Sequence, residues 1–224
     1  MTTNSARATS TRLGLTPEAA GWCTLLAIPA PPKDVHVAAG GGRLRPAFIR
    51  PLGALGYVGA WLLAPFVLLS AAEDVVEQLL AGKAARARAK AKAKEDKELK
   101  EAIVTHGLDR AFDGDWSAAA GQFLLRWYGH SPHHRRLLVL TPERLVLAAP
   151  PRRVSVREAE QTQIVADIRA DEAVVEDPLR GRYAHDRLRI RFGDGSWLTV
   201  VTDKPRGDIH MHLMRRPRLG GRTS

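Results

Sequence analysis

The sequence predicts an α+β protein, with helices in its N-terminal part and a mainly β module in its C-terminal part. Three observations support this. Residues 52–72 carry no charged side chain, residues 73–107 are rich in strong helix formers, and past Trp116 apolar residues begin to alternate with polar ones. Alternation is typical of strands buried on one face, whereas a long stretch without proline favours a helix.

The composition excludes several classes of protein. The 224 residues contain 34 Lys and Arg against 24 Asp and Glu, a formal net charge of +10, and 45% of them are hydrophobic. This is enough apolar material for a core, so the chain as a whole is not expected to be disordered. Cys23 is the single cysteine in the sequence, which excludes a disulfide framework and any zinc site built on a pair of cysteines.

Residues 1–51 are predicted to form a disordered or flexible head. Ser and Thr are frequent near its start, prolines cluster between 29 and 32, and glycines occupy 40–42. Such a composition does not pack a core. A short apolar run, Trp22–Ile28, interrupts the head, but it lies too far from the start to be the core of a signal peptide, so no cleaved export signal is expected.

Residues 52–72 are predicted to form a transmembrane or re-entrant helix. The segment has about the 20 residues required to cross the hydrocarbon core of a bilayer. Pro65 would kink such a helix without forbidding it. Gly56, Ala60 and Ala64 recur at every fourth position, so they share a face on which a second copy could pack and form a homo-oligomer. The flanking cations are nearly balanced and do not decide the orientation. The alternative is a buried helix or hairpin of a soluble domain, with Pro65 as its break.

Residues 73–107 are predicted to form a charged helical stalk that ends near Gly107, a residue suited to a helix C-cap. Between positions 83 and 94 alanines alternate with cations, so this part of the helix has no apolar face and must be exposed. A solvated helix face is the plainest interpretation. Because the cations follow an apolar segment, we also expect contact with anionic membrane lipid through Lys83, Arg86, Arg88, Lys90, Lys92 and Lys94.

Residues 116–217 are predicted to form a β module, followed by a tail at 218–224. A bent sheet or partly open barrel with a helix at one end accounts for about seven short strands and a terminal amphipathic segment. The strongest local pattern is a hairpin over 187–202 with an Asp-Gly turn. The other expected elements are strands at 122–128, 136–141, 144–148, 164–169 and 173–176, and a closing helix at 208–216.

The run from Arg136 to Ala148, a leucine-rich strand followed by Thr, a turn, Arg-Leu and a second strand, resembles the first hairpin of bacterial pleckstrin-homology-like and GRAM-like domains. The later hairpin and closing helix lie where that family has its last two strands and helix. The resemblance covers about residues 116–217. It implies a platform that binds lipid headgroups or proteins and has no catalytic activity. Within the basic loop 129–136, Arg135 and Arg136 are candidate contacts for an anionic ligand.

The motifs of known enzymes are missing from the sequence. It contains no nucleophile elbow, phosphate loop, dinucleotide fingerprint or His-Glu-x-x-His motif. His133 and His134 are adjacent, and His210 and His212 are two positions apart, so neither pair shares a helix face as the ligands of an i, i+4 metal site do. We therefore expect no enzyme, no cofactor and no metal site.

Together these features predict a non-enzymatic protein of the cell membrane whose module faces the cytoplasm and positions a protein partner or anionic lipid. The alternative is a soluble basic protein that binds nucleic acid, with residues 52–72 as a buried core helix. Aromatic residues make up 6% of the chain, no RNA-stacking motif is evident, and acidic residues are interspersed among the cations of the module. These features argue against nucleic acid as the partner.

Overall fold

The structure is a computed structural model that describes residues 3–41, 44, 83–154 and 157–215. The chain divides into two compact units, one formed by residues 1–46 and 102–224 and the other by residues 47–101.

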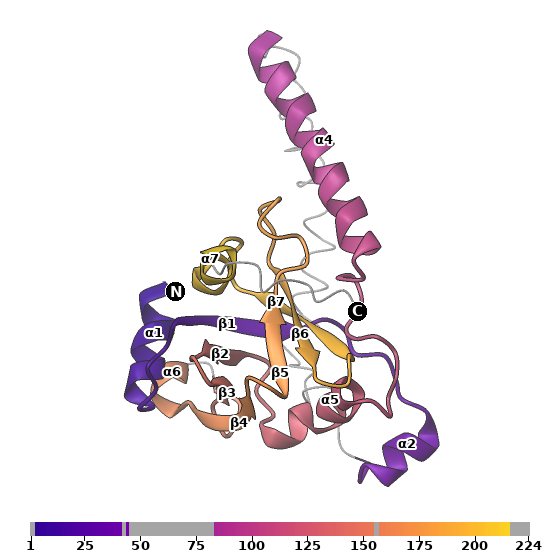
Figure 1. The fold of residues 1–224 in the computed structure, drawn as a ribbon, viewed down its shortest axis with the longest axis vertical. Helices are drawn as coiled ribbons and strands as arrows, with labels where there is room; N and C mark the ends of the chain where they lie inside the picture. The colour runs from indigo at the N-terminus through magenta and orange to yellow at the C-terminus, as the bar shows by residue number, and fades with distance from the viewer. Residues whose placement is uncertain (1–2, 42–43, 45–82, 155–156, 216–224) are drawn as a thin grey trace, which may run out of the picture. The chain divides into compact units, whose positions relative to one another are not determined.

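The first unit is built on a seven-stranded antiparallel sheet (Figure 1). Its strands are β1 (Ala19–Leu25), β2 (Arg136–Leu140), β3 (Arg144–Ala149), β4 (Gln163–Arg169), β5 (Ala173–Glu176), β6 (Arg187–Phe192) and β7 (Trp197–Thr202), in the spatial order β4-β3-β2-β1-β7-β6-β5. The helices are α1 (Thr3–Arg12), α2 (Lys33–Ala38), α4 (Lys83–Thr105), α5 (Ala119–His130), α6 (Glu158–Gln161) and α7 (Asp208–Arg215). The predicted α+β class is therefore confirmed, with a mainly β part.

Strand β1 lies in the middle of this sheet, which corrects the prediction of a disordered head over residues 1–51. Residues 19–23 pair with β2 and residues 23–25 pair with β7. Ala20 and Trp22 pack in an apolar cluster that includes Ala6 of α1, whereas Cys23 belongs to the main core. Alternate residues along β1 therefore pack into two different apolar clusters. Pro29, Pro31, Pro32, Gly40 and Gly41 follow the strand and lie outside it.

Strand β2 is buried on both faces, which explains its unbroken apolar sequence. Leu137 and Val139 belong to the cluster beneath α1, and Leu138 and Leu140 belong to the main core. The N-terminal helix is therefore a covering layer of the sheet and an integral part of the folded unit (Figure 1).

Both predicted hairpins are present. Between β2 and β3 the Thr141 amide donates to the carbonyl of Arg144 at 3.0 Å, and the Arg144 amide donates to the Thr141 hydroxyl at 3.0 Å. Between β6 and β7 the Gly195 amide donates to the carbonyl of Phe192 at 3.0 Å. Gly195 has φ +89°, in the left-handed region that glycine adopts without strain. This is the expected Asp-Gly turn.

The strand predicted at 122–128 is wrong, because this segment is helix α5. Phe123, Leu124 and Trp127 are separated by one, three and four positions, which is the helical period and not the alternation of a strand. All three are buried in the main core, and α5 packs against β6 and β7. The spacing of apolar residues therefore changes from helical to alternating after α5, and not at Trp116 as predicted.

Helix α7 confirms the closing helix predicted at 208–216. It packs against β1 and places Ile209 in the main core. The approach is close, since a Cβ at Gly21 of β1 would lie 3.1 Å from Cδ1 of Ile209. Strand β3 also contacts β5, so the sheet is curved enough to bring strands from its two halves together.

Helix α4 ends as the sequence predicted. Gly107 has φ +66°, its amide donates to the carbonyl of Val104 at 3.0 Å, and the Leu108 amide donates to that of Ile103 at 2.8 Å. This pair of bonds is a Schellman motif. Among the described residues no helix combines the length and the apolar character needed to cross a membrane. The predicted membrane segment, residues 52–72, lies outside the described residues.

Candidate functional site

Three buried side chains able to ligate a metal ion meet between the β5–β6 loop and helix α7. Asp177 and His185 lie at the two ends of the loop and are 8% and 3% exposed, and His210 of α7 is 2% exposed. One ligand atom from each residue lies within 4.8 Å of the other two. The cluster joins segments that are separated in the sequence, so helix spacing could not reveal it.

Asp177 shapes the loop that follows it. Its carboxylate accepts hydrogen bonds from the amides of Leu179 at 2.9 Å, Arg180 at 3.0 Å and Gly181 at 3.0 Å. Burial raises the pKa of Asp177, but the two histidines and the Gly181 amide lower the pKa by more, so it lies well below its ordinary value. The site therefore contains a buried negative charge at neutral pH.

The hydrogen bonds of His185 determine its tautomer. Nδ1 lies 3.3 Å from the Arg187 amide, which donates to it. A ring nitrogen that accepts a hydrogen bond carries no proton, so the proton is on Nε2. Nε2 lies 3.0 Å from Oδ1 of Asp177 and donates to it.

His210 faces the same carboxylate from the opposite side. Its Nε2 lies 3.3 Å from the hydroxyl of Thr202, and that hydroxyl lies 2.9 Å from the carbonyl of Asp186. The Thr202 hydroxyl also lies 3.2 Å from the carbonyl of Lys204, and its single proton either goes to a carbonyl while Nε2 donates to it, or goes to Nε2. Nδ1 of His210 lies 3.6 Å from Oδ2 of Asp177. The ring of His210 thus turns one nitrogen toward Thr202 and the other toward the buried carboxylate.

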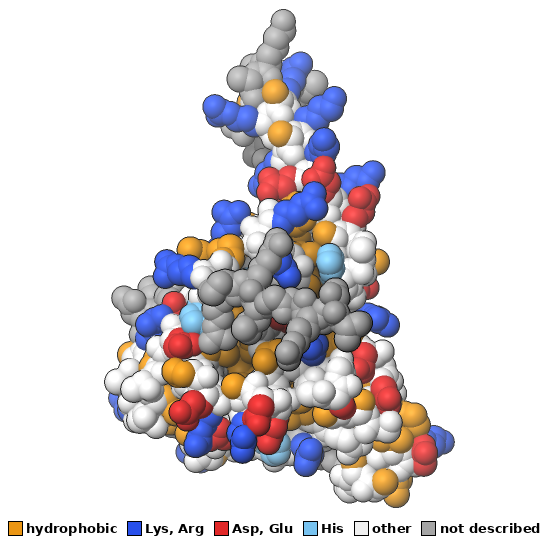
Figure 2. Space-filling view, viewed as in Figure 1, with side chains coloured by type: hydrophobic (Ala, Val, Ile, Leu, Met, Phe, Trp, Pro, Cys, Tyr) orange, Lys and Arg blue, Asp and Glu red, His pale blue; other side chains and the backbone are white. Residues whose placement is uncertain are grey.

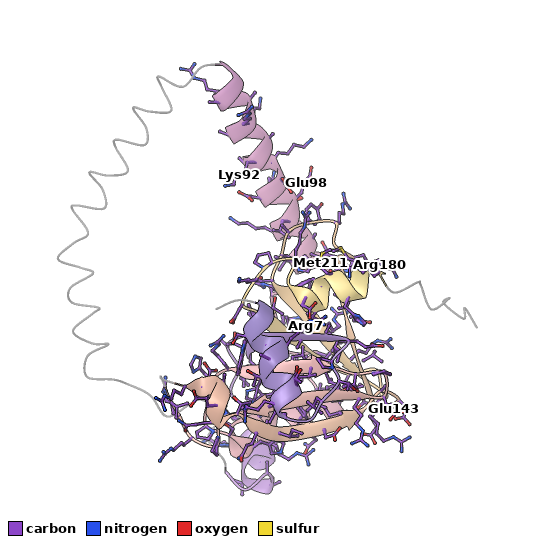
Figure 3. All side chains as sticks on the ribbon, turned by 90° about the vertical axis from the view of Figure 1, so that its left-hand side faces the viewer. Arg7, Lys92, Glu98, Glu143, Arg180 and Met211 are labelled. Carbon is purple, nitrogen blue, oxygen red and sulfur yellow. The ribbon has the colours of Figure 1, made fainter. Side chains whose placement is uncertain are left out.

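The loop that carries Asp177 and His185 lies tightly against α7. Gly181 has φ +66°, and a Cβ at this position would overlap the side chain of Met214. In the view of Figure 3 the labels of Arg180 in the loop and Met211 of α7 fall in the same region of the molecule. The loop that carries Asp177 and His185 therefore packs against the helix that carries His210.

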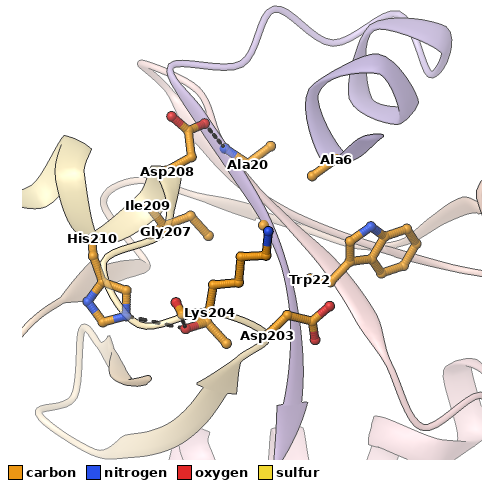
Figure 4. A pocket seen from close by; sticks show the side chains of 11 residues that line it. Ala6, Ala20, Trp22, Asp203, Lys204, Gly207, Asp208, Ile209 and His210 are labelled. Carbon is orange, nitrogen blue, oxygen red and sulfur yellow. Dashed lines mark hydrogen bonds between the residues drawn. The ribbon is translucent and has the colours of Figure 1, made fainter. Parts of the chain in front are cut away.

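A shallow recess lies beside the cluster, between α1, β1 and the start of α7 (Figure 4). Asp208 at its rim accepts hydrogen bonds from the Ala20 amide at 3.0 Å and from Arg7 at 2.8 and 2.9 Å. That carboxylate is thus engaged within the fold. The recess is lined by Ala6, Ala20, Gly21, Trp22, Thr202, Asp203, Lys204, Gly207, Asp208, Ile209 and His210.

Arg136, one of the two cations predicted to contact an anionic ligand, is placed differently by the structure. It is 1% exposed and starts strand β2, so the exposed-loop interpretation is corrected. Its guanidinium donates to the carbonyls of Trp127, Ser131, His133 and Arg135. A guanidinium that is buried and bonded in this way cannot meet a surface.

Arg135 is engaged as well. It donates to Glu158 at 2.8 Å and to Asp203, and its guanidinium lies 4.9 Å from the centre of the Trp22 ring. Neither candidate of the 129–136 loop is therefore placed as a free cation on the surface.

From Arg86 onward the cations of α4 are exposed, as expected. Side chains from 85 to 97 are all solvent-exposed, and Figure 2 shows Lys and Arg side chains around the visible part of the helix. Lys94 lies 3.9 Å from Glu98, and Lys97 lies 3.8 Å from Glu101. The predicted contacts on α4 are Lys83, Arg86, Arg88, Lys90, Lys92 and Lys94, whereas Gly56, Ala60 and Ala64 fall outside the described residues.

Comparison with known proteins gives no relative. No protein-family model matches the chain, and no curated protein and no solved structure shows significant similarity to it.

Proposed function

We propose that the protein is a non-enzymatic, membrane-anchored binding module that positions a protein partner at the cytoplasmic face of the cell membrane. In this proposal residues 52–72 enter the bilayer, α4 contacts anionic lipid, and the sheet-based unit binds the partner. The observation that carries it is the sequence of an uncharged segment of bilayer length followed by a cation-rich helix.

The exposure of α4 supports the lipid contact. Thirteen consecutive residues, 85–97, are exposed, so this stretch of the helix has no packed face. A helix of this length without a packed face is marginal in water unless something else stabilises it. An anionic surface would do so, at about 1 kcal/mol for each Lys or Arg held near it.

The fold supports a pleckstrin-homology-like interpretation of the module. Seven antiparallel strands are followed by a closing helix, and the contact of β3 with β5 is consistent with a partly closed barrel. Because Arg135 and Arg136 are engaged inside the unit, a protein partner is favoured over a lipid headgroup for this part. Exposed Ile164 and Val174 lie on the two edge strands, where a partner chain could pair.

The structure gives less support to nucleic acid as a partner. The alternating arginines of β6 are engaged within the fold: Arg187 donates to the Leu108 carbonyl at 2.7 Å, Arg189 lies 4.3 Å from the centre of the Trp197 ring, and Arg191 donates to Glu176 at 3.2 Å. A phosphate backbone would have to compete with these contacts.

Membrane fractionation tests the anchor. The full chain is compared with a variant in which residues 52–72 are replaced by a Gly/Ser linker of equal length, which keeps β1 and the rest of the sheet in one chain. We expect the full chain to remain in the pellet through high salt and alkaline carbonate, and the linker variant to be released. Release of the full chain by carbonate would overturn the proposal.

Vesicle flotation of the linker variant tests α4 separately. Changing Arg86, Arg88, Lys90 and Lys92 to Gln should lower binding to vesicles containing phosphatidylserine by about 100-fold or more at low salt. The matched control changes Lys97 and Lys100 to Gln, near the acidic end of the same helix, and should bind nearly as well as the linker variant. An equal loss of binding free energy per charge removed in both variants would show that net charge, and not the cation block, is responsible.

A further inference from the structure

We propose that Asp177, His185 and His210 bind one divalent transition-metal ion of the Zn²⁺ type. Among the described residues, this is the one group of three or more His, Cys, Asp and Glu side chains that could hold an ion. The inference is independent of the anchoring proposal.

The donor set suits such an ion. Two imidazole nitrogens and one carboxylate oxygen are ligands that Zn²⁺ binds in proteins, at about 2.0–2.2 Å. In a tetrahedral site these ligand atoms lie roughly 3.3 Å apart. His185 Nε2 is 3.0 Å from Asp177 Oδ1 and His210 Nδ1 is 3.6 Å from Asp177 Oδ2, so each histidine lies close to this distance from a different carboxylate oxygen. One ligand atom from each residue lies within 4.8 Å of the other two, so a small adjustment would bring all three around one ion.

The burial of the cluster favours a bound cation. Asp177, His185 and His210 are 8%, 3% and 2% exposed, and a ring nitrogen of each histidine faces the Asp177 carboxylate. A carboxylate removed from water is costly unless it is paired or coordinates a metal ion. An ion bound to all three side chains would neutralise the carboxylate and engage both rings.

The residues behind the ligands hold them in position. The Thr202 hydroxyl lies 3.3 Å from His210 Nε2, and this contact leaves Nδ1 directed at Asp177. The amides of the 179–181 turn fix the Asp177 carboxylate. Metal sites use such outer hydrogen bonds to orient their ligands. To ligate through Nε2, His185 must move its proton to Nδ1 and give up the hydrogen bond from the Arg187 amide, which at 3.3 Å is a long one.

The bound ion would fasten the β5–β6 loop to helix α7. Three protein ligands leave a fourth position for water or another donor. Because the ligands come from two elements that meet only in the folded chain, binding would stabilise the folded state and leave the unfolded state unaffected.

The experiment measures the metal content and thermal stability of the full chain. Protein in detergent is stripped with a chelator, dialysed and titrated with Zn²⁺ against a chromophoric competitor. We expect one ion per chain and, at a hundredfold excess over Kd, a rise in Tm of about 5–10 °C. His185→Gln and His210→Gln should each lose the ion and the Tm rise. His212→Gln, on the same helix but outside the cluster, should keep both.

A second measurement requires no variant. Co²⁺ added to the stripped wild-type chain should give visible absorption bands of tetrahedral coordination, and Zn²⁺ should abolish them. If the wild-type chain binds no Zn²⁺ and shows no cobalt bands, or if His210→Gln binds as the wild type does, the proposal fails.

Discussion

The guanidinium of Arg136 lies 4.8 Å from the centre of the Trp127 ring and donates to the backbone carbonyl of the same residue at 2.8 Å. Trp127 stands in the last turn of α5, where helix carbonyls have no partner within the helix and the helix dipole is negative. Arg136 therefore acts as a cap on α5 supplied by the first residue of β2. Among the described residues no carboxylate forms an ion pair with it.

Replacing Arg136 is predicted to destabilise the sheet-based unit strongly. Burial lowers the pKa of Arg136 to about 10, so it remains charged at neutral pH and bonded to its carbonyls. Arg136→Met would leave several buried carbonyls without a donor and should cost about 3 kcal/mol in the free energy of unfolding. Arg136→Lys keeps the charge but loses the planar set of donors, and should cost less. Urea unfolding followed by tryptophan fluorescence measures both.

Arg126→Met is a suitable control, because Arg126 is exposed on α5 and donates to the carbonyl of Gln122 at 3.3 Å, within its own helix. It should change the free energy of unfolding by less than about 0.5 kcal/mol. Equal losses at positions 126 and 136 would contradict the capping role.

Ser196 is predicted to stabilise the opposite end of α5. Its hydroxyl accepts a hydrogen bond from the Ala120 amide at 2.9 Å and donates to Asp194 at 2.6 Å. Ala118, at the N-cap position, has no side chain that could do this. Ser196→Ala should therefore cost about 1–2 kcal/mol. Ser196→Thr, which restores the hydroxyl, should recover part of the loss in the same measurement, and failure to do so would indicate a packing effect instead.

The sequence predicted most of the C-terminal strands because they alternate or lie beside clear turns. The helix of residues 122–128 was missed because the segment was grouped with the strands that follow it, although Phe123, Leu124 and Trp127 have the helical spacing with which α5 packs against β6 and β7. Strand β1 was missed for a different reason. Its pairing partners β2 and β7 begin more than 100 residues later, and no local pattern reports such a long-range contact.

The position of β1 predicts that the β module does not fold without the N-terminal segment. Removing residues 1–30 would leave β2 and β7 without their shared neighbour and expose the apolar faces that Trp22 and Cys23 cover. We expect loss of near-ultraviolet circular dichroism and of cooperative urea unfolding. Removing only residues 1–12, which takes α1 but leaves β1, should retain a cooperative transition at lower stability. A cooperative transition in the longer deletion would disprove the central role of β1.

The candidate metal site could not be predicted from the sequence for the same reason. Near His210 in the sequence, the one other histidine of the closing helix is His212, and the two do not have the i, i+4 spacing of a helical metal site. Asp177 and His185 lie in a loop whose residue pattern does not differ from that of an ordinary polar turn. A signal was present in the run Asp-Pro-Leu-Arg-Gly, in which an Asp precedes a tight turn, but its partner in α7 follows only from the fold.

The contact between Arg7 and Asp208 predicts a pH-dependent contribution to stability. Burial raises the pKa of Asp208, but the hydrogen bonds from Arg7 and from the Ala20 amide lower the pKa by more, so it lies below its ordinary value in the folded chain. A carboxylate with a depressed folded-state pKa contributes stability above the pKa of the unfolded chain and loses it as the pH falls through the folded pKa. The contribution is thus present at pH 7 and declines below about pH 4.

A double-mutant cycle at Arg7 and Asp208 measures this contribution. With Arg7→Met and Asp208→Asn, we expect a coupling of about 1 kcal/mol or less at pH 7, because Arg7 is 45% exposed and solvent screens the pair. The coupling should shrink at pH 3. The matched control is the Arg169–Asp171 pair, bonded at 2.7 Å but exposed on both sides, where we expect no measurable coupling. Equal coupling energies in the two pairs would show that the Arg7–Asp208 contact between α1 and α7 stabilises the folded chain no more than an exposed ion pair does.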